Sequence, residues 1–276
     1  MSVMPNLLSS FEERSGSNQR LQINRVDNLK ELSYYLFLPD SLSDKSKIMV
    51  CVHGISFNAK EQITTFSERA NKHNYIIVAP CFYKKYYKGY QRLETGAAGY
   101  TPAIALDKML QDVEDKHGVD TQIFSLFGYS GGAQFSHRYA MFYPERISRL
   151  IVSSAGWFTF PDEEKIYPYG LKNTPDFSST IKNKLAKFLQ LPIHVIIGEL
   201  DNIQDDGLNK RKLINRQQGY HRLDRAKNWV DALQSQSKAM SLKSCIRFII
   251  IKGCGHSFEN CERLGDLGKY IFTSDH

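Results

Sequence analysis

The chain has 276 residues, of which 42% are hydrophobic, 24% are charged and 12% are aromatic. These proportions are those of an ordinary globular protein and exclude a disordered or fibrous chain. The formal net charge is +7, but the lysines and arginines are dispersed, whereas nucleic-acid binding needs them gathered on one face. We therefore expect no nucleic-acid partner.

The N-terminal residues 1–20 lack the basic start, apolar stretch and small-residue cleavage site of a signal peptide. No apolar run in the chain approaches the roughly 18 residues that cross a bilayer. The five cysteines are an odd number and are spread out, unlike the dense frameworks of small secreted domains. We expect a cytoplasmic protein with no membrane partner, mostly reduced cysteines and a short flexible segment at 1–20. A bridge between Cys254 and Cys261 stays open.

From residue 33 onward, short apolar runs alternate with longer amphipathic stretches, which is typical of a mostly parallel sheet with crossover helices. The expected strands lie at 32–38, 48–52, 75–79, 122–127, 150–153, 193–197 and 246–251. Several runs are nearly all apolar, as expected of strands that are covered on both faces. The first of them, 32–38, is expected at an edge of the sheet.

Between these strands, apolar residues recur at helical spacing. The expected helices lie at 60–73, 101–117, 132–143, 221–235 and 257–270. Residues 157–190 break the alternation and indicate a lid-like insertion above the sheet. The chain shows no repeat and no linker, so the sequence predicts one α/β domain over residues 21–276, with about seven to eight strands.

The most informative stretch is 123–135, where an apolar strand runs into residues 128–132 (GYSGG) and then into a helix. In a G-x-S-x-G turn the serine occupies a strained strand-to-helix connection, and the flanking glycines let the backbones approach closely. The helix that follows directs its N-terminal amides toward developing negative charge. The pattern predicts Ser130 as a nucleophile, and the alternative is a glycine-rich turn with an inert serine.

Two partners are expected after such a serine, an acid and then a histidine, each just after a later strand. Asp201 follows the strand at 193–197, and His256 follows the strand at 246–251. An ionised carboxylate holds the imidazole in the tautomer that accepts the serine proton. We expect Asp201 and His256 to complete a triad. Glu199 is the reserve candidate for the acid, and the neighbouring Asp205 and Asp206 also compete for that role.

The loop after the strand at 48–52 begins with His53, Gly54 and Ile55. Its position matches the loop that supplies one of the two backbone donors of an oxyanion hole. We expect the backbone N–H groups of Ile55 and Gly131 to be these donors. His53 is expected to be structural.

A metal site at Cys254, His256 and Cys261 is a weaker hypothesis, although both residue types bind zinc. Structural zinc sites usually have two ligand pairs at tight spacing, and no second pair accompanies this group. The chain has neither a G-x-G-x-x-G motif after a strand nor a phosphate-binding G-x-x-x-x-G-K-[ST] motif. We therefore expect no metal and no cofactor.

With these residues in place, the chain resembles the α/β-hydrolase superfamily from about residue 33 to the end. The segments at 90–93, 128–147, 155–162 and 217–233 are similar to a bacterial esterase-like group related to polyhydroxybutyrate depolymerases and feruloyl esterases. The resemblance implies hydrolysis of a carboxylic ester through an acyl-enzyme, on a small-molecule or oligomeric ester and without a cofactor.

The substrate is less well determined, because the same triad on the same fold also cleaves amides and thioesters. A serine peptidase or amidase would be distinguished by its pocket, for example by a carboxylate pair that binds a substrate amine. A non-enzymatic binding protein is a further alternative, although such proteins usually lose a triad member. We expect Tyr129, Trp157 and Phe158 at the substrate pocket, while the aromatic residues of the insertion could equally be local core. The oligomeric state stays open.

Overall fold

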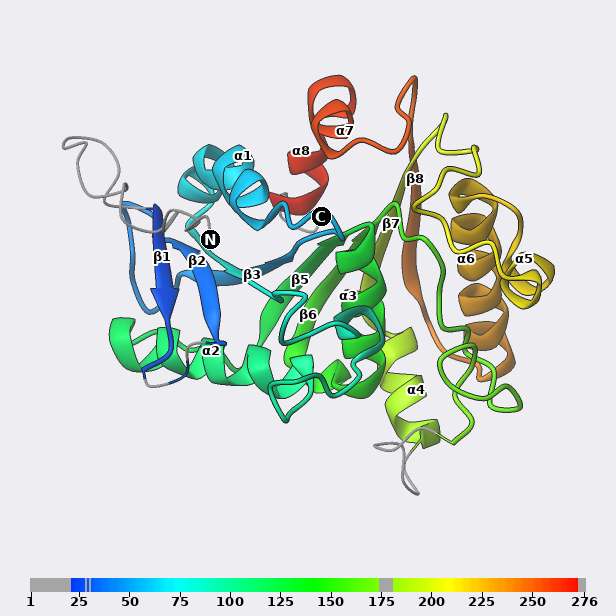
Figure 1. Cartoon of the computed structure of the whole chain (residues 1–276), viewed down its shortest axis with the longest axis horizontal. Coiled ribbons are helices and arrows are strands. Elements are labelled where there is room, and N and C mark those ends of the chain that lie inside the picture. The colour runs from blue at the N-terminus through cyan, green and yellow to red at the C-terminus, as the bar shows by residue number, and fades with distance from the viewer. Residues whose placement is uncertain (1–20, 28, 30, 174–180, 273–276) are drawn as a thin grey trace, which may run out of the picture.

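The computed structural model describes residues 21–27, 29, 31–173 and 181–272 of the chain, so the segment at 1–20 lies outside the described part. Eight strands form one sheet in the order β1-β2-β4-β3-β5-β6-β7-β8 (Figure 1). The strands are β1 (Leu21–Arg25), β2 (Ser33–Phe37), β3 (Lys47–Val52), β4 (Tyr75–Pro80), β5 (Phe124–Tyr129), β6 (Ile147–Ser153), β7 (Pro192–Gly198) and β8 (Cys245–Ile251). β2 runs antiparallel to its two neighbours, and all other pairs are parallel. The predicted mostly parallel α/β sheet is confirmed.

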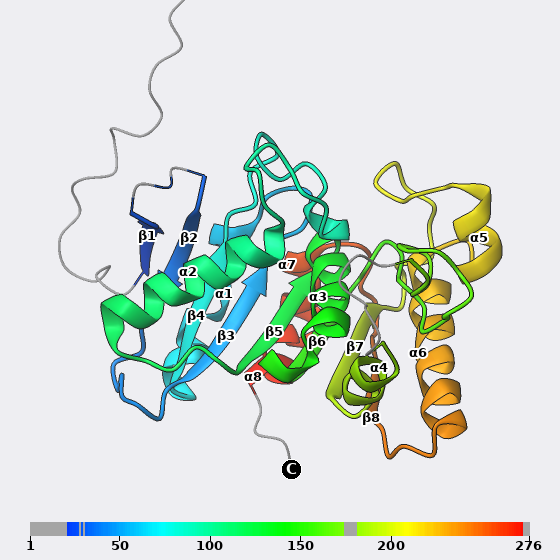
Figure 2. The same ribbon diagram turned by 90° about the horizontal axis from the view of Figure 1, so that it is seen from below.

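Helices cover both faces of the sheet (Figures 1 and 2). One face carries α1 (Ala59–Lys72), α7 (Phe258–Gly265) and α8 (Leu267–Phe272), and the other carries α2 (Pro102–His117), α3 (Gly131–Phe142), α4 (Ile181–Leu189) and α6 (Arg222–Ala239). A short helix, α5 (Lys212–Gln218), precedes α6. Successive strand side chains point to opposite faces, so Met49 and Cys51 enter one hydrophobic core while Val50 and Val52 enter the other.

The first strand, β1, is a correction to the sequence prediction. The stretch at 32–38 was expected at the sheet edge, but β1 pairs with β2 from Leu21↔Phe37 to Arg25↔Ser33 and takes the edge itself. None of the five β1 side chains is fully buried. An edge strand with this little burial needs no apolar run, which is why the hydrophobic pattern did not reveal it.

The C-terminal helix expected at 257–270 is in fact two helices, α7 and α8. Asp266 separates them with a left-handed backbone, φ 53°, that ends α7. The side chain of Asp266 forms an ion pair with Arg69 of α1.

The short helix α5 was not predicted from the sequence. Among the described residues, no helix is long and apolar enough to cross a membrane.

The insertion expected at 157–190 connects β6 to β7 and contains α4, and its residues 174–180 lie outside the described part. Its first residues pack against α3 and α6. Phe158 stacks on Trp229 of α6 with ring centroids 4.5 Å apart, and the Arg138 guanidinium of α3 lies 4.3 Å from the Trp157 ring centroid. Trp229 Nε1 also donates to the backbone oxygen of Thr159 at 2.9 Å. These contacts fasten the start of the insertion to the two helices.

The turn between β5 and α3 depends on two glycines that allow backbone to touch backbone. A Cβ atom on Gly132 would lie 1.9 Å from the Val52 oxygen at the end of β3, and one on Gly128 would lie 2.4 Å from the Gly132 carbonyl. Real Cβ atoms do not come so close to backbone. Both glycines of the G-x-S-x-G motif therefore permit the close approach that the motif predicts.

Replacing Gly132 by alanine is expected to lower the free energy of unfolding by about 3 kcal/mol, because the backbone of β3 must move to admit the methyl group. Urea unfolding of purified protein measures this. The matched control is Gly255→Ala, where the nearest atom to the added Cβ is 3.8 Å away, and its stability should stay within about 0.5 kcal/mol of the parent. Equal stability of all three proteins would contradict the expectation.

Candidate active site

Ser130 occupies the turn between β5 and α3 in a backbone conformation that is costly for a residue with a side chain. Its φ is 52° and its ψ is −110°. The backbone N–H of Ser130 donates to the Ser153 oxygen at the end of β6, at 2.8 Å. Such strain persists only where the surroundings enforce it, and here it leaves the Ser130 side chain partly exposed at the carboxyl edge of the sheet.

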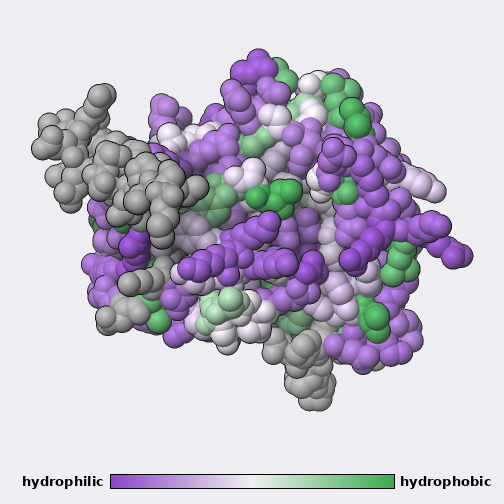
Figure 3. Space-filling view, viewed as in Figure 1, coloured by the Kyte–Doolittle hydropathy of each residue, from purple (hydrophilic) through white to green (hydrophobic). Residues whose placement is uncertain are grey.

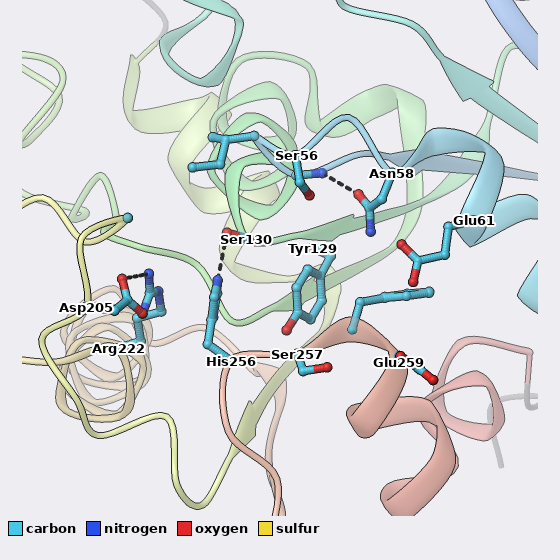
Figure 4. Close-up of a pocket in the computed structure, with 14 residues that line it drawn as sticks. Ser56, Asn58, Glu61, Tyr129, Ser130, Asp205, Arg222, His256, Ser257 and Glu259 are labelled. Carbon is cyan, nitrogen blue, oxygen red and sulfur yellow. Dashed lines mark hydrogen bonds and ion pairs between the residues drawn. The ribbon is translucent and has the colours of Figure 1, made fainter.

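The structure brings Ser130, His256 and Asp201 into one hydrogen-bonded chain (Figure 4). Ser130 Oγ lies 3.1 Å from His256 Nε2, and His256 Nδ1 lies 2.9 Å from Asp201 Oδ2. The loops after β7 and β8 are bonded to each other, because Leu200 N donates to the Cys254 oxygen at 2.8 Å. The Asp201 side chain is 1% exposed. This geometry can move a proton from the serine hydroxyl to an imidazole whose tautomer is set by a carboxylate.

The competing carboxylates have other partners. Glu199 accepts from Gly253 N at 3.0 Å. Asp205 forms a bidentate ion pair with Arg222, and Asp206 lies 3.6 Å from the Lys210 ammonium. Of the four acids considered from the sequence, Asp201 is the one whose carboxylate lies within hydrogen-bonding distance of the His256 ring.

Behind His256 lies a group of buried side chains. The Tyr129 ring stacks on the His256 ring with centroids 5.6 Å apart. Cys254 and Cys261 are buried, and all five cysteines are free, so the bridge left open from the sequence is not formed. Burial raises the pKa of Tyr129 and of both thiols, and these groups are therefore neutral. No cluster of three or more His, Cys, Asp or Glu side chains in the described part could hold a metal ion.

The two backbone amides expected to form an oxyanion hole lie next to each other. A Cβ atom on Gly131 would lie 3.1 Å from the Ile55 nitrogen and 2.9 Å from Ile55 Cγ2. One on Gly54 would lie 3.6 Å from the Ser130 Cβ. Residues 54, 55 and 131 therefore lie beside the serine, which is where oxyanion donors are expected.

The loop that carries Ile55 is held by side chains from other segments. His53 Nε2 accepts from Phe82 N at 3.0 Å, so its proton is on Nδ1, which donates to the Gly54 oxygen at 2.7 Å. Tyr90 Oη donates to the His53 oxygen at 3.0 Å, and Asn58 Oδ1 accepts from Gly54 N at 2.9 Å. His53 is structural, as expected. The supporting roles of Asn58 and Tyr90 were not predicted, although Tyr90 lies in the segment 90–93 that carries the resemblance; Asn58 has no motif.

A cavity of about 410 Å³ opens beside Ser130 and His256. Its lining includes Tyr129, as expected from the sequence, but neither Trp157 nor Phe158. The Phe158 side chain is 1% exposed and lies in the core between α3 and α6. The remaining lining residues are Gly54, Ile55, Ser56, Asn58, Glu61, Asp205, Gly207, Arg222, Ser257, Phe258 and Glu259. Figure 4 shows Asp205 and Arg222 on one side of His256, and Glu61 and Glu259 on the other.

The family profile described as "alpha/beta hydrolase fold" matches residues 50–194, which is more than half of the chain. The chain belongs to the alpha/beta hydrolase family. Feruloyl esterase B of Talaromyces funiculosus is 25% identical over 129 residues, a match that covers 45% of this chain and 36% of that protein. The chain therefore spans about a third of this curated relative.

Two solved structures of hydrolases are similar over nearly the whole chain. Poly(aspartic acid) hydrolase-1 from Sphingomonas sp. KT-1 gives a TM-score of 0.78, with 22% identity and coverage of 92% of this chain and 98% of that one. LpqC, the poly(3-hydroxybutyrate) depolymerase of Bordetella parapertussis, gives 0.76, with 22% identity and coverage of 91% and 89%. At this identity the likeness shows a shared fold. The resemblance predicted from the sequence is confirmed.

The buried imidazole of His53 gives the protein a pH-dependent stability. Burial lowers the pKa of His53 from 6.5 to about 4. The folded protein therefore keeps His53 neutral while the unfolded chain is protonated, and stability is lost as the pH falls from 6.5 to 4, by roughly 3 kcal/mol for a shift of this size. The loss ends near the folded pKa. His137, also buried with a lowered pKa, adds to the trend.

Urea unfolding at pH 7 and at pH 4.5 measures this dependence. His53→Asn should be less stable than the parent at pH 7 but should lose less stability on acidification, because it has no group to protonate. The control is His73→Asn, at an exposed residue whose pKa is lowered by partial burial and nearby cations but less than that of His53, so the parental difference should shrink less than in His53→Asn. A His53→Asn protein with the full parental difference would show that His53 is not the group responsible.

Proposed function

We propose that the protein is a serine hydrolase that cleaves a carboxylic ester through an acyl-enzyme, with Ser130 as nucleophile, His256 as general base and Asp201 as the acid. The observation that carries the proposal is the pair of contacts from Ser130 Oγ to His256 at 3.1 Å and from His256 to Asp201 at 2.9 Å. Membership of the family and a curated relative named as a feruloyl esterase support it.

In the proposed reaction, Ser130 Oγ attacks the ester carbonyl carbon while His256 Nε2 takes its proton. The tetrahedral oxyanion accepts hydrogen bonds from the N–H groups of Gly131 and Ile55. His256 then gives the proton to the leaving alkoxide as the ester C–O bond breaks. A water molecule, deprotonated by His256, attacks the acyl-enzyme, and the acid is released with Ser130 restored. Asp201 stays ionised and stabilises the imidazolium.

A fluorophosphonate probe tests the nucleophile directly. Wild-type protein should label, and Ser130→Ala should neither label nor hydrolyse p-nitrophenyl esters, with kcat lower by at least about a thousandfold. Ser67→Ala, a serine on α1 whose hydroxyl bonds the Thr64 oxygen, is the matched control and should label like the parent. If folded wild-type protein fails to label, the proposal is wrong and a non-enzymatic binding role takes its place.

A second candidate function is amide hydrolysis, because the cavity contains the type of carboxylate pair that would bind a substrate amine. Glu61 at the start of α1 and Glu259 at the start of α7 both line it. Asp205 and Arg222 also line the cavity, but they are paired with each other, so their charges offset and the two glutamates remain. The balance of charge in the cavity is therefore negative and favours neutral or cationic substrates.

The expected outcome is that choline-like cationic esters are hydrolysed with a kcat/KM at least about tenfold above that of matched anionic esters. The double variant Glu61→Gln, Glu259→Gln should reduce this ratio while its turnover of a neutral ester changes little. The same samples are given an aminoacyl p-nitroanilide. Rapid anilide turnover that the double variant loses would replace the ester assignment with the amidase one.

A further inference from the structure

The Asp201 carboxylate has a second partner besides His256. Its Oδ2 bonds the imidazole, while its Oδ1 lies 3.3 Å from Arg222 Nη1. Arg222 is the first residue of α6, and the adjacent Leu223 N donates to the Asp201 backbone oxygen at 3.1 Å. The Arg222 side chain is only 2% exposed. A buried guanidinium needs carboxylate partners, and this one is directed at Asp201, the carboxylate proposed to orient His256.

Asp205 completes the arrangement from the side of the cavity. Its two oxygens lie 2.5 Å and 2.9 Å from Arg222 Nη1 and Nη2, a bidentate pair. The hydrogen bonds from Arg222 hold the pKa of Asp205 below its usual range, and a positive charge on His256 acts in the same direction. Asp205 is therefore close enough to the imidazole for the two charges to influence each other.

We propose that Arg222 and Asp205 are positioning residues for the triad: Arg222 holds the oxygen of Asp201 that His256 does not use, and Asp205 neutralises Arg222. The inference rests on the proposed function. Without Asp205, an uncompensated guanidinium would oppose protonation of His256. Without Arg222, the Asp201 carboxylate would be free to rotate away from the imidazole.

Apart from Asp201, we take Arg222 and Asp205 as the charged groups next to His256. The other titratable groups around the ring are either neutral or on the opposite side of the cavity. Tyr129, Cys254 and Cys261 pack behind the ring and are neutral, because burial raises the pKa of each. Glu61 and Glu259 line the opposite side of the cavity (Figure 4). Arg222 Nε has no hydrogen-bond partner among the described residues, so carboxylates bound at Nη1 and Nη2 determine where the guanidinium points.

The test compares Asp205→Asn, Arg222→Gln and Arg222→Lys with the parent. The readouts are kcat and KM for p-nitrophenyl acetate from pH 5 to 9, and titration of the His256 imidazole by NMR in histidine-labelled protein, its signal assigned by loss in His256→Asn. The matched control is Asp206→Asn, whose carboxylate is fully exposed and should behave as the parent in both readouts.

Asp205→Asn should move the acid limb of kcat/KM to lower pH, and Arg222→Gln should move it to higher pH, each by about half a unit or more. Arg222→Gln should also lower kcat by about tenfold to a hundredfold, with KM within about threefold, because the imidazole is less well oriented. Arg222→Lys keeps the charge and should leave the limb near its parental position while kcat stays low. A merely structural ion pair predicts an unchanged kcat in folded Arg222→Lys, which keeps the charge.

Shifts of the same sign, or none, in folded variants would overturn the inference. If Arg222→Gln does not fold, the comparison of Asp205→Asn with Arg222→Lys decides, since the first must move the limb and the second must not. The NMR titration needs no turnover. Wild-type protein that fails to label but shows the expected NMR shifts would therefore refute the proposed function and leave the positioning roles intact.

Discussion

The contact between the first turn of α3 and the backbone of β3 determines the geometry of the whole site. Because Gly132 lies against the Val52 oxygen, α3 begins directly at the sheet, and Ser130 has to turn the chain with a positive φ. The same approach places the Gly131 backbone beside the Ile55 amide. The proposed nucleophile and the proposed oxyanion donors thus depend on one close packing contact.

The electrostatics of the site follow from where the parallel strands end. β5, β7 and β8 present Ser130, Asp201 and His256 at the same edge of the sheet. On the face of the molecule seen in Figure 3, hydrophilic side chains predominate and apolar ones are scattered among them. The net charge of +7 does not describe the cavity, whose lining contains more carboxylates than guanidinium groups. Local composition, and not the global charge, is what a substrate meets.

The sequence was sufficient wherever the signal was local. Apolar runs located the seven strands from β2 to β8, and the strand-serine-helix pattern located Ser130, because both arise from a few consecutive residues. The signal was insufficient where a role depends on distant segments. Tyr90 and Arg222 gain their contacts only when remote loops come together. The aromatic character of Trp157 and Phe158 likewise shows that these side chains need apolar contacts, but not on which side of the chain. In the structure they contact α3 and α6.

Arg222 places a cation at the N-terminus of α6, where the helix dipole is itself positive. Asp201 and Asp205 offset this unfavourable charge, so the carboxylate that orients His256 also allows α6 to begin where it does. Active-site residues commonly reduce stability, and replacing them often makes a protein more robust. Here the usual trade-off is reversed for Asp201. Loss of Asp201 would leave the buried Arg222 with Asp205 as its remaining carboxylate partner, and would therefore weaken the start of α6 as well as the site.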